Sequence, residues 1–234
     1  MNMLLRQLGV GCLTGFLMLS VSGCVSPVSP RMPAVLGLSE ELMDVTSNPS
    51  DHWAKYRTFG LVTVSDATGP EAAPAVSSTL LLTLTRRVEA YFEHQCGGIA
   101  LKRFPMPDFH AGKGLISLRH VARQHDVEAV IIVIFSSTES MEAATFGEAR
   151  MMTQMPGTTT YNTALVELAL LDVAEGRLAL RIVQTAVERL DRLNVPIGSD
   201  QGTREEALDI LRAQAGQQAL DRGLEGLTHG CPSA

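Results

Sequence analysis

The stretch Val127-Glu128-Ala129-Val130-Ile131-Ile132-Val133-Ile134-Phe135 is the most apolar of the strand-like segments in this chain. From Val130 to Phe135 no polar residue interrupts it. A strand that exposes one face to water alternates polar and apolar residues, whereas a strand covered on both faces does not need to. The stretch therefore predicts a central strand in a sheet that is covered on both faces.

Two strand–helix units precede this stretch. Apolar runs predict the strands, and apolar residues at helical spacing predict the helices between them. The expected elements are a strand over 56–65, a helix from Ser77 or Ser78 to about Gln95, a strand over 99–104 and a helix over 114–125. This alternation is typical of a sheet covered by helices.

The segment 136–163 follows the central stretch and differs from it in composition. It is polar, rich in Thr and Met, and contains Pro156-Gly157. Ordinary connections have median lengths of about 4–6 residues, so this one is unusually long. It predicts either a mobile binding loop or an extended hairpin.

Methionines are concentrated in this segment, and methionine packs adaptably against different apolar partners. The group is Met141, Met151, Met152 and Met155. It is a candidate partner-binding site on a long loop. The alternative is that these side chains fold back onto the domain.

A hairpin comes next, with arms over 165–173 and 178–187 joined by Ala174-Glu175-Gly176-Arg177. Its glycine supplies the tight turn. Thr203 and Glu206 then have the spacing of a capping box, which predicts a final helix from Thr203 to about residue 227. The expected fold class is α/β (α+β): a single mixed sheet of about five strands, in the order β-α-β-α-β, long loop, β-hairpin, α, with helices packed on it.

The N-terminus has the layout of a secretory signal peptide. Arg6 precedes an apolar run over 8–19, and such a run is too short to span a bilayer as a helix. Val21-Ser22-Gly23-Cys24 resembles the lipobox of bacterial lipoproteins. The resemblance implies removal of residues 1–23 and attachment of acyl chains such as palmitate to Cys24, which anchor the protein in a membrane. The alternatives are an ordinary signal peptide with a chance cysteine, or an uncleaved anchor.

Val25 follows the lipobox, where inner-membrane lipoproteins of enterobacteria commonly carry Asp. By this resemblance Val25 favours the outer membrane and a domain that faces the periplasm; the inner membrane is the alternative. The segment 24–50 is broken by prolines and is expected to be a flexible tether. A single periplasmic domain over 51–234 is expected to follow it.

The composition is that of a globular protein, with 45% hydrophobic residues. The chain has 19 Lys and Arg against 25 Asp and Glu, and only Arg6 of these charges lies in the signal peptide. A net acidic domain with scattered basic residues is a poor candidate for binding nucleic acid or anionic lipid through its surface. Membrane attachment is therefore expected through Cys24 alone.

Two of the four cysteines remain once the N-terminus is accounted for. Cys12 leaves with the signal peptide, and Cys24 is lipidated. Cys96 and Cys231 are then expected to form one disulfide in the oxidising periplasm, with two free thiols as the alternative. A metal site is not expected, because no Cys-x-x-Cys motif or His pair accompanies either residue.

A catalytic constellation is missing from the sequence. Gly198-Ser199-Asp200-Gln201-Gly202 has Asp where a nucleophile elbow would have its nucleophile, and Gly112-Lys113-Gly114 lacks the rest of a phosphate loop. His120 and His125 are five residues apart, which places them on different faces of a helix. We therefore expect no enzyme activity and no cofactor.

The order of elements resembles a group of outer-membrane lipoproteins that share the small α/β domain of the TolB N-terminal part, LpoB and CsgG. The likeness is best at Val121-Ala122-Arg123-Gln124-His125-Asp126-Val127-Glu128-Ala129-Val130-Ile131-Ile132. A second match, Ala169-Leu170-Leu171-Asp172-Val173-Ala174-Glu175-Gly176-Arg177-Leu178, is also similar to the rhombotarget lipoproteins. The resemblance covers about 55–227 and implies the fold, without assigning a functional residue.

The main functional hypothesis is a non-catalytic envelope lipoprotein whose domain binds another envelope protein or a cell-wall component. One alternative is a homo-oligomeric secretion or pore-associated lipoprotein. The segment 136–163 lacks the sustained alternation that a membrane-crossing strand needs, which argues against a pore. A cell-wall hydrolase is the third hypothesis, and the missing catalytic residues disfavour it.

Overall fold

The computed structural model describes residues 30–39, 53–68, 72–97, 99–104, 114–146, 155–193, 201–228 and 231. Cys24 and the predicted signal peptide lie outside these residues. The elements in chain order are α1 (Met32–Leu36), β1 (Phe59–Ser65), α3 (Ser78–Gln95), β2 (Leu101–Arg103), α4 (Gly114–Gln124), β3 (Ala129–Phe146), β4 (Met155–Asp172), β5 (Arg177–Leu193) and α5 (Gln201–Leu227).

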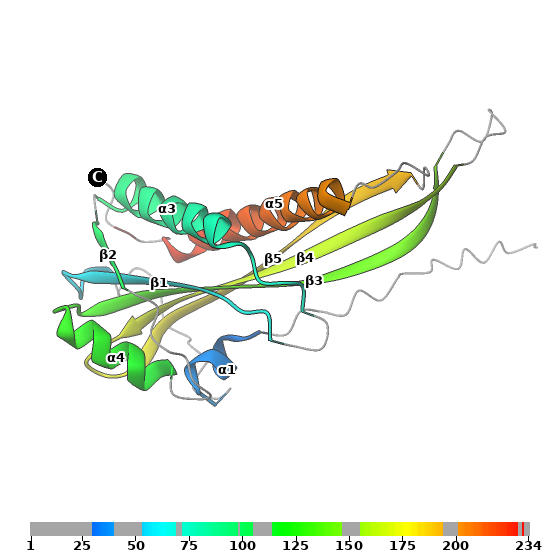
Figure 1. Cartoon of the computed structure of the whole chain (residues 1–234). Helices are drawn as coiled ribbons and strands as arrows, with labels where there is room; N and C mark the ends of the chain where they lie inside the picture. The colour runs from blue at the N-terminus through cyan, green and yellow to red at the C-terminus, as the bar shows by residue number, and fades with distance from the viewer. Residues whose placement is uncertain are drawn as a thin grey trace, which may run out of the picture.

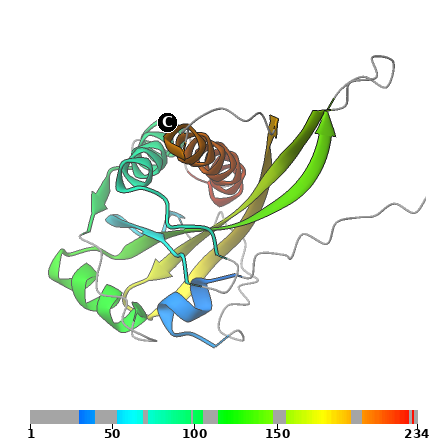
Figure 2. The same cartoon turned by 45° about the vertical axis from the view of Figure 1, so that its right-hand side comes forward.

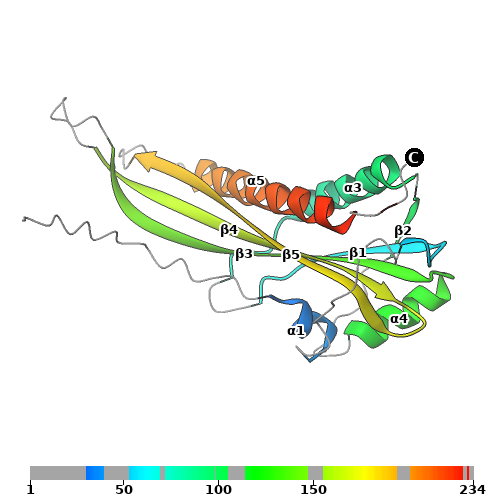
Figure 3. The same ribbon diagram turned by 180° about the vertical axis from the view of Figure 1, so that it is seen from behind.

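The five strands form one mixed sheet in the order β2-β1-β3-β4-β5. β1 runs parallel to both β2 and β3, while β4 is antiparallel to β3 and to β5. Helices α3 and α5 lie on one face of the sheet, and α1 and α4 lie on the other (Figure 1). The view from behind shows the same two layers around the sheet (Figure 3). The predicted fold class is confirmed.

The stretch 127–135 provides the central strand, as predicted. Residues 129, 131, 133 and 135 face the core beneath α3 and α5, and residues 130, 132 and 134 face the core beside α1 and α4. All seven side chains are buried. Successive strand residues point to opposite faces, so an unbroken apolar run supplies both cores at once.

Helix α3 begins and ends where the sequence predicts. The Ser77 hydroxyl accepts a hydrogen bond from the backbone N–H of Leu80 at 3.2 Å, which caps the helix. Gly97 follows the helix with φ of +63°, the left-handed conformation that glycine adopts most readily. Leu84, Val88 and Phe92 point into the core at helical spacing.

The segment 136–163 is not a long loop. Strand pairing between β3 and β4 continues from Ala129 opposite Asp172 to Phe146 opposite Met155. The extended hairpin, which was the second of the two expectations, is therefore correct. Backbone hydrogen bonds to a partner strand do not require apolar side chains, and β-branched threonine suits a strand.

The last hairpin is confirmed with longer arms. β5 continues to Leu193 rather than ending near residue 187, and Gly176 has φ of +70° at the turn. The final helix is also present, but its cap is not the predicted one. Because α5 begins at Gln201, Thr203 lies inside the helix and cannot be its N-cap. None of the helices in the described part of the chain combines the length and apolar character needed to cross a membrane.

The expected tether over 24–50 is too long, because part of it is packed on the domain. Met32 and Leu36 of α1 are buried in the core beside α4. Trp53, just beyond the expected boundary at residue 51, packs against Phe59 and Phe92 in the other core. Pro33 does not break α1, because proline is tolerated in the first turn of a helix.

Candidate functional site

The candidate functional site is the outer part of the β3–β4 hairpin, residues 136–146 and 155–165, called here the β3–β4 arm. Its far end extends past the N-terminal end of α5 (Figures 1 and 2). Ser136 and Leu165 are buried at its base, whereas Glu142, Ala143 and Thr145 are exposed farther out. Beyond the core, β3, β4 and β5 therefore continue as a three-stranded projection, and only the last residues of β3 and the first of β4 extend past β5.

A buried arginine fixes the arm to α5. Arg212 is almost fully buried, and its Nε lies 2.5 Å from Oε1 of Glu139 on β3. Its Nη1 donates to Oδ1 of Asp209 at 2.7 Å. Burial disfavours the Arg212 charge, but the hydrogen bonds to these two carboxylates outweigh burial and raise its pKa. The contact sets the direction in which the arm leaves the domain.

One face of the arm is rich in hydroxyl groups. Strand alternation continues the α1 and α4 side of the sheet through three pairs of β3 and β4 residues: Thr138–Thr163, Ser140–Tyr161 and Glu142–Thr159. No described helix lies beneath this part of the sheet (Figures 1 and 3). Thr159 and Thr163 of this face are buried, whereas Glu142 is exposed.

The methionine group is only partly located. Met141 lies on β3 with 53% of its surface exposed, so for this residue the idea that the side chain folds back onto the domain is wrong. Met155 begins β4, opposite Phe146. Met151 and Met152 lie outside the described residues. Met141 and Met155 are therefore strand residues of the arm and not residues of a loop.

Glu167 on β4 holds α1 against the sheet, and the sequence analysis missed it. Its side chain is fully buried, and Oε1 accepts hydrogen bonds from the backbone N–H groups of Arg31 and Met32. Oε2 accepts one from Arg181 at 2.8 Å. A lone carboxylate between Val166 and Leu168 in a buried strand was the available signal, because buried charges require partners.

A second polar cluster lies at the opposite end of the sheet, around Asp172. Lys55 donates to Oδ2 of the buried Asp172 at 2.6 Å, and the Tyr56 hydroxyl donates to the same oxygen at 2.9 Å. The backbone N–H of Glu175 donates to Oδ1 at 2.8 Å. These groups line an open hollow of about 720 Å³.

The electrostatics of this cluster are those of a closed ion-pair network. Burial would raise the pKa of Asp172, but hydrogen bonds from Glu175, Lys55 and Tyr56 outweigh it and lower the pKa below the usual Asp range. Burial and the hydrogen bond to Asp172 raise the pKa of Tyr56 to about 12. Each group stabilises the protonation state that the others need, so the cluster ties residues 55–56 to the end of β4.

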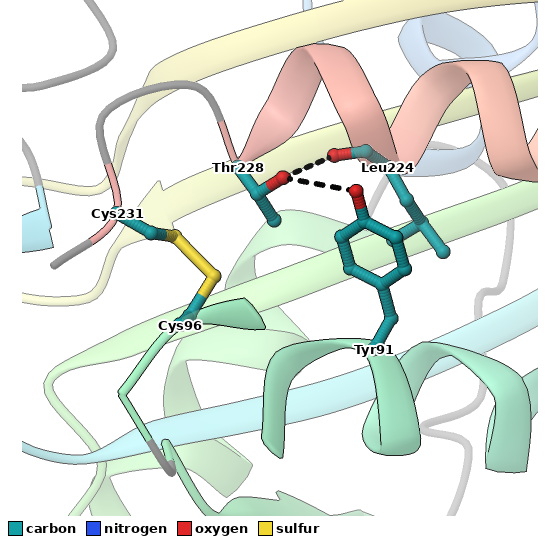
Figure 4. The surroundings of a disulfide bond; sticks show 5 residues. All are labelled: Tyr91, Cys96, Leu224, Thr228 and Cys231. Atoms are coloured by element: carbon teal, nitrogen blue, oxygen red, sulfur yellow. Dashed lines mark hydrogen bonds between the residues drawn. A yellow bond between two sulfur atoms is a disulfide. The ribbon is translucent and has the colours of Figure 1, made fainter. Parts of the chain in front are cut away.

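Cys96 and Cys231 are joined in the structure (Figure 4). Their Cα atoms are 5.1 Å apart, although 135 positions separate them in sequence. Cys96 follows the last residue of α3, and Cys231 lies just beyond α5. Near the bond, Thr228 donates to the Leu224 carbonyl at 2.8 Å and lies 3.5 Å from the Tyr91 hydroxyl. The bridge therefore ties together the C-terminal ends of the two helices on one face.

The described residues contain no group of three or more His, Cys, Asp or Glu placed to hold a metal ion. His120 and His125, which the sequence separates onto different faces, make separate contacts. His120 lies 3.1 Å from the Gln124 side chain, and His125 packs against the ring of Phe104.

No family model matches the chain, and no curated protein matches it. Among solved structures, it is similar to a homolog of the neuraminyllactose-binding hemagglutinin from Helicobacter pylori, at 8% identity and a TM-score of 0.43 over 73% of this chain and 83% of that one. It is also similar to rare lipoprotein B from Shewanella oneidensis, at 16% identity and a TM-score of 0.32 over 74% and 94%. A minor lipoprotein from Acinetobacter baumannii has 12% identity and a TM-score of 0.35 over 76% and 96%. These likenesses assign no family and no function to the chain.

Proposed function

We propose that this chain is a non-catalytic lipoprotein of the bacterial outer membrane, facing the periplasm, that presents the β3–β4 arm to another envelope protein. One observation carries the proposal: the arm leaves the helix-covered core while Arg212 and Glu139 hold its direction. A projection with a fixed direction loses little conformational entropy when a partner binds it. Met141 supplies an exposed apolar contact on the arm, and methionine adapts to different partner surfaces.

The proposed anchor is the lipidated Cys24. Only six residue steps separate it from Pro30, the first described residue. A chain of that length spans at most roughly 20 Å. Because Glu167 holds the start of α1 on the sheet, the domain would stay close to the membrane surface.

The test of the anchor is metabolic labelling of cells with an alkyne analogue of palmitate. The wild-type chain is expected to carry the label and to sediment with membranes. Cys24→Ala is expected to lose the label and to leave the outer-membrane fraction. A labelled Cys24→Ala variant, or an unlabelled wild-type chain, would contradict lipidation at this residue.

The test of the arm is photocrosslinking in intact cells. A photoreactive residue is placed at Met141, and in a matched control at Ile116 of α4. Ile116 is 71% exposed and therefore more accessible than Met141. We expect the residue at position 141 to form a crosslinked protein adduct, which is identified by mass spectrometry. The yield of the same adduct from position 116 is expected to be at least fivefold lower. Equal adducts at both positions, or none at 141, would reject the arm as the binding surface.

A further inference from the structure

The outer edge of β5 is a long strand edge that, from Arg181 to Leu193, pairs with no other strand in the described structure. β5 is the last strand of the sheet and is paired with β4 from Arg177 to Leu193. The other edge strand, β2, has only three residues. An unpaired edge displays free N–H and C=O groups, which bind another strand unless they are covered.

The edge is covered at one point by the protein itself. Arg222 of α5 donates to the backbone carbonyl of Thr185 at 3.0 Å. This contact indicates that the peptide groups of Thr185 face the free side. In an antiparallel ladder every second residue does so, and hence Val187, Arg189 and Asp191 face the free side too. One open part of the edge therefore runs from Thr185 to Leu193, where the strand ends.

The charges in this open part are self-complementary. The sequence is Glu188-Arg189-Leu190-Asp191-Arg192. When two copies run antiparallel with a two-fold axis at Leu190, each Arg189 lies opposite Asp191 of the other copy. Each Glu188 likewise lies opposite Arg192. Directly opposed residues of antiparallel strands share a face, so each of these pairs brings opposite charges together.

The same charges disfavour the neighbouring registers. A shift of the axis to Arg189 or to Asp191 places that residue opposite its own copy. A half-residue shift toward Arg189 places Glu188 opposite Asp191, and a half-residue shift the other way places Arg189 opposite Arg192. Like charges directly opposite each other are unfavourable. The backbone N–H and C=O groups of Arg189 and Asp191 face the free side. In the register at Leu190, the backbone of each Arg189 is therefore hydrogen-bonded to the backbone of Asp191 in the other copy.

The side chains are available for such pairing. Arg189 is exposed, and its only ion pair among the described residues is a 2.9 Å contact with Asp191 in the same strand. Glu188 accepts a hydrogen bond from Gln218 at 3.1 Å, and within the described structure Arg192 has no ion pair. The Thr159 hydroxyl, 2.8 Å from Asp191, helps to hold that carboxylate at the edge. Side by side, two such edges would place two Arg189–Asp191 pairs on one face of the sheet and two Glu188–Arg192 pairs on the other.

We infer that two copies of this chain pair antiparallel through the outer edges of β5, with the two-fold axis at Leu190, so that one continuous sheet runs through both copies. This interface is isologous, because the same surface contributes from each copy, and it closes at two. The surface involved is the edge of β5, whereas the proposed partner contact lies on the β3–β4 arm, so either proposal can fail without the other.

The first experiment places a cysteine on the proposed axis. In the full chain expressed in bacteria, Leu190→Cys brings two thiols opposite each other in a non-hydrogen-bonded pair, whose Cα atoms lie about 4.5 Å apart, within disulfide range. We expect a covalent dimer on a non-reducing gel after oxidation with copper phenanthroline. Val187→Cys and Ile116→Cys are matched controls, because both residues are exposed but neither opposes its own copy. Their dimer yield is expected to be at least fivefold lower.

The second experiment changes the charges in the Leu190→Cys background. Asp191→Arg places arginines opposite each other and is expected to lower the dimer yield at least fivefold. The double exchange Arg189→Asp with Asp191→Arg restores opposite charges and is expected to restore the yield. Circular dichroism of each variant separates loss of pairing from loss of folding. A Leu190→Cys yield no higher than that of Ile116→Cys, or a folded double exchange that does not recover, would overturn the inference.

Discussion

Asp172 ends β4 with little exposed surface and receives hydrogen bonds from Lys55, Tyr56 and the backbone of Glu175. The folded chain therefore stabilises the charged form of the Asp172 carboxylate more than the unfolded chain does. A carboxylate whose pKa is lowered by folding stabilises the protein above its unfolded pKa, and this stability disappears as the pH falls through the folded pKa. Acidification is therefore expected to remove the contribution of Asp172 to the free energy of unfolding.

We expect the free energy of unfolding, measured by urea titration, to fall as the pH is lowered below the ordinary Asp value of about 3.9. Asp172→Asn is expected to lower it by roughly 2 kcal/mol at pH 7, because charged hydrogen bonds are lost, and to flatten its dependence on pH below 4. Glu175→Gln is the control, since that side chain is exposed, and should have little effect. An unchanged pH profile in Asp172→Asn would show that Asp172 does not carry the acid sensitivity.

Glu167 gives a second prediction at this scale. Glu167→Ala removes the acceptor for two backbone N–H groups at the start of α1 and leaves Arg181 without its carboxylate. Removing one partner of a buried ion pair typically costs about 3–5 kcal/mol. Hydrogen exchange at residues 31–38 is expected to accelerate at least tenfold, while exchange in β3 changes little. Equal protection of 31–38 in both proteins would mean that burial of Met32 and Leu36 and the ion pair of Arg31 with Asp66 hold α1 without Glu167.

Single residues differ in how far the sequence revealed them. The pairing of Cys96 with Cys231 was reached by elimination, since the other two cysteines were assigned elsewhere. Glu167 was not found, because its partners are backbone groups more than a hundred residues away. Sequence periodicity gives the face on which a side chain lies but not the segment that covers that face.

At the scale of elements, the attachment of the β3–β4 arm to α5 can be tested. Arg212→Met keeps the length of the side chain but removes the hydrogen bonds to Glu139 and Asp209. We expect faster hydrogen exchange in residues 139–143 and 160–164 and unchanged exchange in β1. The photocrosslink at position 141 should weaken as the arm loses its direction. Unchanged exchange in these segments would show that strand pairing alone fixes the arm.

The elements were predicted best where apolar residues define them. The run 127–135 gave the central strand, and helix α3 began at the predicted serine. The segment 136–163 left two possibilities open, because its strands continue beyond the core and have little apolar pattern to reveal them. The prediction that Thr203 caps the final helix was wrong, because a four-residue motif carries little information about where a helix begins. A short motif fits many places, and α5 begins two residues earlier.

The disulfide acts on the whole molecule. It closes a loop with a sequence separation of 135 and joins the last turns of α3 and α5. Long loops lose the most conformational entropy in the unfolded chain when they are closed, and removal of a native disulfide typically costs about 2–5 kcal/mol. Replacement of both cysteines by serine is expected to lower the free energy of unfolding by that amount. An intact mass that shows two free thiols in the wild-type chain would contradict the bridge.

The docking of α1 has a mechanical consequence. If Cys24 is lipidated as proposed, a pull between membrane and domain acts on the start of α1, which Glu167 and the ion pair of Arg31 with Asp66 hold against the sheet. While α1 stays bound, the segment between Cys24 and Pro30 spans at most roughly 20 Å. If the load detaches α1, the upper limit is set by the 29 residue steps from Cys24 to Trp53, which span at most roughly 100 Å. The Glu167 carboxylate would thus control how far the domain can move from the membrane. The domain would stay near the membrane without load and could reach farther into the periplasm when tension detaches α1.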